Sequence, residues 1–143
     1  MITRYENVVV DMACRIMAPF IFLFGLYVIA HGHYSPGGGF QGGAILAGTV
    51  ILLRLSMGTE RTRHSFPRKI GPILGAVGLL IYAGTGLATL IHGGMYLDYS
   101  FLPIPGVSGA YLRYLGILIV EIGVGMGVFG IMLAIFDNLV EVK

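Results

Sequence analysis

The sequence predicts an all-α integral membrane protein with four transmembrane helices and a glycine-rich junction before the second helix. Of the 143 residues, 56% are apolar and only 11% are charged, whereas soluble proteins carry about 25% charged residues. A soluble chain of 15.3 kDa could not bury so much apolar surface, so lipid is the expected solvent. The apolar runs are continuous and lack the alternation of an outer-membrane barrel, which favours helices over strands.

Four apolar segments have lengths near the roughly 20 residues that cross about 30 Å of hydrocarbon. They cover residues 8–30, 40–57, 70–92 and 114–136. We expect them to form one transmembrane domain over residues 1–143. No small-residue cleavage site follows the first segment, which is therefore predicted to be a helix of the mature chain and not a signal peptide. The single cysteine, Cys14, excludes an internal disulfide bond.

The distribution of basic residues predicts the topology. Eight of them lie in the terminal stretches, near the ends of the first two helices or in the connection GTERTRHSFPRK: Arg4, Arg15, Arg54, Arg61, Arg63, Arg68, Lys69 and Lys143. Only Arg113 lies on the opposite side. The positive-inside rule then places both termini and this basic connection in the cytoplasm. The run HGHYSPGGGFQGG (31–43) and the loop at 93–113 are expected outside.

Small residues line one side of each of the last two helices. At 100° per residue, a sector of about 100° on the third helix contains Gly71, Gly75, Gly78, Tyr82, Thr85, Gly86, Thr89 and Gly93. One face of the fourth helix contains Gly116, Gly123, Gly127 and Gly130. Such stripes let helix backbones approach closely in lipid. Either both stripes pack within the subunit or at least one binds another polypeptide. We expect the second arrangement, because four small helices cannot easily bury both.

Glu121 is the only acid with membrane-length apolar sequence on both sides. A charged carboxylate at that depth costs several kcal/mol unless it is paired, protonated or hydrated. The residues that share its face of the helix, away from the glycine stripe, are Tyr114, Gly125, Val128 and Met132. We expect Glu121 to be a station on an ion or proton route. The alternative is a structural carboxyl group that is protonated or hydrogen-bonded to a neighbour.

Other polar residues indicate structural roles. Asp11 and Arg15 have the i, i+4 spacing of an ion pair within a helix. Arg54 lies near the cytoplasmic end of the second helix, where its side chain can snorkel toward the headgroups. His31 and His33 could contact a metal ion, but no further His, Cys or carboxylate in that loop completes a site. We therefore expect no metal and no cofactor.

The run HGHYSPGGGFQGG is predicted to be a close-packed junction. Its glycines allow positive φ angles and a close approach of another chain segment. It lacks the Gly-Lys-Ser/Thr ending of a phosphate-binding loop. Because Gly37 to Gly39 disfavour a regular turn, the second helix is expected to begin near Phe40 or Gln41. We expect this junction to serve packing, and Glu121 to carry the ion chemistry.

A family resemblance rests on these motifs. GHYSPGGGFQGGAI, followed by an apolar helix, resembles the signature of the B subunit (MnhB family) of Mrp-type multisubunit cation/proton antiporters. The same module recurs in membrane-bound hydrogenases and related archaeal respiratory complexes. The motif residues are Gly32, His33, Pro36, Gly37, Gly38, Gly39, Phe40, Gly42 and Gly43. The segment VEIGVGMGVFG is similar to the family's last helix, in which the acid is often Asp and here is Glu121.

The resemblance implies a small, non-catalytic, multi-pass subunit of a complex in the cytoplasmic membrane. Its implied partners are other membrane subunits and the lipid bilayer, with Na⁺ and H⁺ as the ions that the complex transports. The net charge of +2 is too small and too scattered to indicate nucleic acid. Three alternatives stay open: the same subunit in a hydrogenase or sulfur-reducing complex, a purely structural assembly subunit, and a small transporter that acts alone. Because such complexes carry their ion-pumping residues mainly in larger subunits, the role of Glu121 is a hypothesis.

Overall fold

The computed structural model describes residues 8–34, 37–58, 61–62 and 64–141. Within these ranges, four helices are long and apolar enough to cross a membrane: α1 (Val8–Ala30), α2 (Gly38–Met57), α4 (Ile70–Ile91) and α5 (Ala110–Glu141). Two short 3₁₀ helices lie in the connections: η1 (Gly32–Tyr34) and η2 (Tyr99–Phe101). The described residues contain no strand, which confirms the predicted all-helical class.

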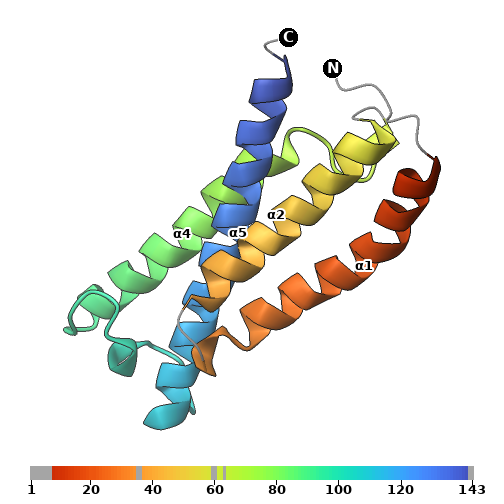
Figure 1. Cartoon of the computed structure of the whole chain (residues 1–143). Coiled ribbons are helices and arrows are strands. Elements are labelled where there is room, and N and C mark those ends of the chain that lie inside the picture. The colour runs from red at the N-terminus through yellow and green to blue at the C-terminus, as the bar shows by residue number, and fades with distance from the viewer. Residues whose placement is uncertain (1–7, 35–36, 59–60, 63, 142–143) are drawn as a thin grey trace.

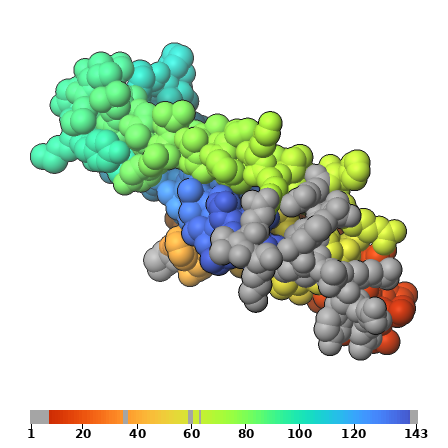
Figure 2. Space-filling view, turned by 90° about the horizontal axis from the view of Figure 1, so that it is seen from above, coloured from red at the N-terminus to blue at the C-terminus, as the bar shows by residue number. Residues whose placement is uncertain are grey.

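The helices pack in the spatial order α1, α2, α5, α4 (Figure 1). Helix α2 contacts α1 on one side and α5 on the other, and α4 packs against α5. The start of α1 and the end of α5 lie at the same end of the bundle, while η1 and η2 lie at the opposite end. Figure 2, seen from above, shows α4 along one margin of the molecule with the last turns of α5 beside it. The two connections that were expected on the outer side therefore share one end.

Helix α2 begins earlier than the sequence predicted. Its first helical residue is Gly38, not Phe40, because Gly37 alone makes the turn with a left-handed φ of 94°. Gly38 and Gly39 are helical and buried. Glycine in a helix costs about 0.5–1 kcal/mol relative to alanine. The close packing described below, which only a residue without a side chain permits, offsets this cost.

Helix α5 extends past both predicted ends, from Ala110 to Glu141. Its last turns include Asp137, which is 8% exposed and forms an ion pair with Arg54 of α2. This contact stabilises the polar last turns of α5, which lie beyond residue 136, where the apolar segment ends. The extension brings a charged residue of the tail into contact with α2.

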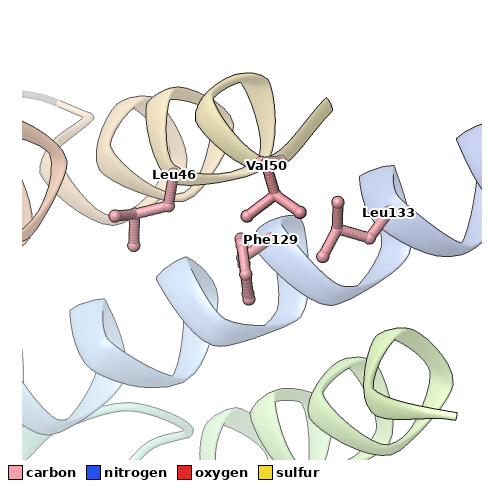
Figure 3. Packing of buried hydrophobic residues seen from close by; sticks show 5 residues of the cluster. Leu46, Val50, Phe129 and Leu133 are labelled. Carbon is pink, nitrogen blue, oxygen red and sulfur yellow. The ribbon is translucent and has the colours of Figure 1, made fainter. Parts of the chain in front are cut away.

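The apolar core lies between α2 and α5 (Figure 3). Leu46 and Val50 of α2 pack against Phe129 and Leu133 of α5, and all four are at most 7% exposed. Burial from water would stabilise each by about 1.5–3 kcal/mol. In lipid the surroundings are already apolar, so the gain comes from close packing instead. The core therefore fixes how α2 and α5 lie against each other.

Helices α4 and α5 meet through their glycine stripes. A methyl group on Gly78 would overlap the backbone of Gly123 and Gly127. A methyl group on Gly71 would stand 3.0 Å from the carbonyl oxygen of Gly130. The two stripes thus pack on one another within the chain. The expectation that one of these stripes binds another polypeptide is corrected, because facing small residues satisfy both helices at once.

The connection between α4 and α5 folds back onto the helix ends. The hydroxyl of Thr89 accepts a hydrogen bond from the backbone N–H of Leu97 at 3.1 Å. Asp98 caps η2 by accepting a backbone N–H bond at 3.1 Å. These contacts place the ring of Tyr99 over Gly116, where an added methyl group would stand 2.7 Å from it. The connection therefore brings a phenol close to α5.

Candidate functional site

The glycine-rich junction and Glu121 come together at the end of the bundle that carries η1 and η2. Gly32 lies so close to the carboxylate of Glu121 that a methyl group on this glycine would overlap it. A methyl group on Gly38 would stand 3.1 Å from Oε1 of Glu121. One on Gly39 would stand 2.6 Å from the backbone oxygen of Glu121. Two glycines of the motif therefore leave the space in which the carboxyl group lies, and a third lets α2 approach the backbone of Glu121.

The next glycines of the motif hold α2 between its two neighbours. A methyl group on Gly42 would stand 2.7 Å from the backbone oxygen of Gly25 in α1. On Gly43 it would stand 2.5 Å from the backbone oxygen of Gly125 in α5. Phe40 points away and is 62% exposed. The spacing of the glycines thus follows from packing, because the first turns of α2 lie too close to both α1 and α5 to carry side chains at these positions.

The sequence analysis treated the junction and Glu121 as separate features, and the structure shows that they are in contact. Gly32 and Gly38 lie beside the carboxyl group of Glu121, and Gly39 lies against its backbone. Pro36 lies outside the described residues. The sequence placed Gly125 and Val128 on the face of Glu121, and both lie against Gly43. That shared face therefore packs on α2.

His33 is the second ionisable group at this position. Its ring packs edge-on against Tyr114 of α5 with 4.6 Å between ring centroids, and the imidazole lies near enough to the Glu121 carboxyl group to interact with it electrostatically. Nδ1 of His33 and Oε2 of Glu121 are both buried and have no hydrogen-bond partner among the described residues. Buried polar atoms are normally hydrogen-bonded. Glu121 and His33 each have a buried atom without such a partner, and together they form the candidate site.

Tyr99 is a further titratable group near Glu121. Burial raises the pKa of Tyr99, and the neighbouring Tyr82 and Glu121 raise this pKa further. Tyr99 therefore stays a neutral phenol at physiological pH. The phenol of Tyr99 thus adds a polar but uncharged group near Glu121.

The opposite end of the bundle holds a buried ion pair that the sequence analysis missed. Arg54 is 1% exposed and pairs with Asp137. Its guanidinium also donates to the backbone oxygen of Phe66 at 2.9 Å, and Arg68 donates to the backbone oxygen of Asp137 at 3.1 Å. The snorkelling prediction for Arg54 is wrong, because α5 extends far enough to supply a buried counter-charge. The signal was Asp137 itself, an acid directly after an apolar helix.

The remaining predicted groups are placed as follows. Arg15 pairs with Asp11 at 2.9 Å, which confirms the predicted pair within α1. Gly75 of α4 packs on Ile131 of α5. No cluster of three or more His, Cys, Asp or Glu residues that could hold a metal ion occurs within the described ranges.

Comparison with known proteins identifies relatives along most of the chain. A family described as a domain related to the MnhB subunit of Na⁺/H⁺ antiporters matches residues 9–134. The B subunit of the Na⁺/H⁺ antiporter of Bacillus subtilis (strain 168) is 31% identical over 130 residues, with 86% of this chain and 90% of the relative covered. The putative antiporter subunit mnhB2 of Staphylococcus aureus (strain Newman) is 36% identical over 128 residues, with 85% and 90% covered.

A solved structure shares the fold. It is a chain of the membrane-bound sulfane sulfur reductase, an archaeal respiratory membrane complex, and it matches with a TM-score of 0.69 and 29% identity. The match covers 94% of this chain, which spans 58% of the length of that one.

Proposed function

Because the chain belongs to the family of MnhB-related subunits of Na⁺/H⁺ antiporters, we propose that it serves as a non-catalytic subunit of a complex that exchanges Na⁺ for H⁺. Its four membrane-length helices within the described residues make it a multi-pass membrane protein. Its partners are then the other membrane subunits of the antiporter. The cytoplasmic membrane is the proposed location, and residues 1–143 are proposed to form one transmembrane domain.

The proposed topology places the candidate site on the outer side of the membrane. The basic connection between α2 and α4 and both termini would face the cytoplasm, by the positive-inside rule. The arrangement in Figure 1 supports this, because η1 and η2 lie together at the end opposite the start of α1. Protons or cations from outside would then reach Glu121 from the end that carries the glycine junction.

The packing of Glu121 against three glycines, two of which lie beside its carboxyl group, is the observation that carries the proposed role. Its Oε2 is buried without a hydrogen-bond partner among the described residues. A carboxylate at membrane depth is stabilised by a proton or by a cation. A group that takes either one in turn has the property that exchange requires. Glu121 is therefore proposed as a station on the ion or proton route of the complex.

The decisive comparison is between Glu121→Gln and Glu121→Asp in the assembled complex. Na⁺-driven proton exchange would be measured in membrane vesicles with a pH-sensitive dye, and assembly by co-purification of the other subunits. Glu121→Gln should abolish exchange in an assembled complex, because an amide neither ionises nor binds Na⁺ as a carboxylate does. Glu121→Asp should retain activity. Full exchange by an assembled Glu121→Gln complex would exclude the route.

A second candidate function follows from the similarity to the sulfane sulfur reductase chain. The subunit would then belong to a respiratory complex in which a redox reaction drives ion transport. The subunits that co-purify distinguish the two hosts. Iron–sulfur or nickel–iron partners would indicate the redox-driven complex, and their absence from an active Na⁺/H⁺ exchanger would indicate the antiporter.

A purely structural role remains as the third candidate, and the glycine junction favours it. In that case substitutions at Gly38 or Gly39 would dissociate the complex, since each lies against a neighbouring element. Glu121→Gln would then leave exchange unchanged. The same vesicle assay therefore separates a structural subunit from one that lies on the route.

A further inference from the structure

His33 is half-buried and lies near the Glu121 carboxyl group, whose Oε2 atom is buried. The residue before it, Gly32, touches the Glu121 carboxylate. The His33 ring packs on Tyr114, which is seven residues before Glu121 and thus about two turns away on the same face of α5. Two separate elements, η1 and α5, therefore hold the imidazole and the carboxyl group on the same face of α5.

The other side of the imidazole leads outward. The His33 ring lies 4.0 Å from the ring of Tyr34, whose side chain is 82% exposed. The ring of His31, an exposed residue, lies 6.4 Å away. His33 itself is half-buried. It is thus the ionisable side chain that adjoins both the exposed rings of the junction and the buried acid.

The groups around His33 and Glu121 are phenols, apart from the imidazole of His31, which is exposed and lies 6.4 Å from the His33 ring. They come from α1 and its end, η1, α5, η2 and α4: Tyr27, His31, Tyr34, Tyr111, Tyr114, Tyr99 and Tyr82. The part of α2 that packs here consists of glycines. The charged groups of the outer connection, Asp98 and Arg113, are engaged with Ser100. Imidazole is the side chain that takes up and releases protons near neutral pH.

We propose that His33 exchanges the proton of Glu121 with the outer end of the bundle. The imidazolium releases its proton to the carboxylate, which leaves a neutral imidazole and a carboxylic acid, and the reverse transfer restores both ions. Nδ1 of His33 and Oε2 of Glu121 are buried and have no hydrogen-bond partner among the described residues. They are therefore not hydrogen-bonded to each other, and the proton passes between them through a bridging water. This inference rests on the proposed role of Glu121 and adds the group through which its proton arrives.

The test uses the complete complex with His33→Ala and the closely sized His33→Gln. Both should lower Na⁺-driven proton exchange in vesicles by about 100-fold, the loss typical when a positioned acid–base group is removed. Free imidazole added to the medium should restore a substantial part of the exchange by the His33→Ala complex, because it can carry the same proton. A purely structural loss would not respond to imidazole. Assembly is followed by co-purification.

His31→Ala is the matched control, since it removes a neighbouring imidazole that is exposed. Its exchange should stay within about twofold of the unchanged complex, a difference of about 0.4 kcal/mol in barrier. Two results would overturn the proposed proton transfer through His33. One is an unchanged exchange rate in the His33→Ala complex. The other is an assembled His33→Ala complex whose lost exchange is not restored by imidazole. If Glu121→Gln abolishes exchange while His33→Ala does not, only the proposed transfer through His33 fails. If Glu121→Gln is silent, the proposed function fails first.

Discussion

The carboxylate of Glu121 occupies the space that a side chain on Gly32 would need. These two residues belong to the two motifs that stand out in the sequence and were expected to act separately. Their contact gives the glycine-rich junction a direct relation to the acid. The glycines of the junction have no side chains, and the space that this leaves determines where the carboxylate of Glu121 can lie.

Gly32→Ala should therefore abolish ion exchange while the complex still assembles. The added methyl group overlaps the Glu121 carboxylate, so the carboxyl group must turn away from His33. Gly48→Ala is the control, because a methyl group there meets nothing within 4 Å and alanine favours the helix. Vesicle exchange and co-purification are the two measurements. An active Gly32→Ala complex would show that the position of the carboxyl group is not critical.

Gly78→Ala should destabilise the contact between α4 and α5 by about 1–3 kcal/mol, as overpacking of a close contact does. The methyl group would overlap the backbone of Gly123 and Gly127, which cannot move aside as a flexible side chain can. The free energy of unfolding of the subunit in detergent micelles is the measurement.

Gly84→Ala and Gly127→Ala serve as controls for this prediction. Added methyl groups at these two positions meet nothing within 4 Å, so neither variant should lose stability. A neutral Gly78→Ala would contradict the close approach of the two glycine stripes.

Removing one partner of the buried pair between Arg54 and Asp137 should be strongly destabilising. Arg54→Met or Asp137→Asn leaves an uncompensated buried charge, which typically costs 3–5 kcal/mol. The double variant Arg54→Met with Asp137→Leu should recover much of this loss, since neither charge then remains. A double-mutant cycle on unfolding free energies measures the coupling. Purely additive losses would mean that the two side chains do not act as a pair.

The sequence could predict the helices but not which motifs meet. Continuous apolar length identifies a membrane span almost by itself, and the position of Glu121 within one is visible in the sequence. Its contact with Gly32 depends on η1 folding back onto α5, which no local pattern encodes. Asp137 was assigned to a tail because hydropathy falls there. The helix continues because Arg54, distant in sequence, supplies the charge that stabilises it.

Tyr99→Phe should leave the pH dependence of exchange unchanged near neutral pH and should protect the subunit in strong alkali. Burial, with Tyr82 and Glu121, raises the pKa of this phenol above its ordinary value of 10.0. The stability contributed by the neutral phenol is then complete below pH 10.0 and is lost as the pH rises through the raised pKa. Phenylalanine has no proton to lose, so the variant should keep its stability over that alkaline range. Unfolding measured across a pH series checks this sign, and a shift in the neutral-pH exchange profile would instead place Tyr99 on the proton route.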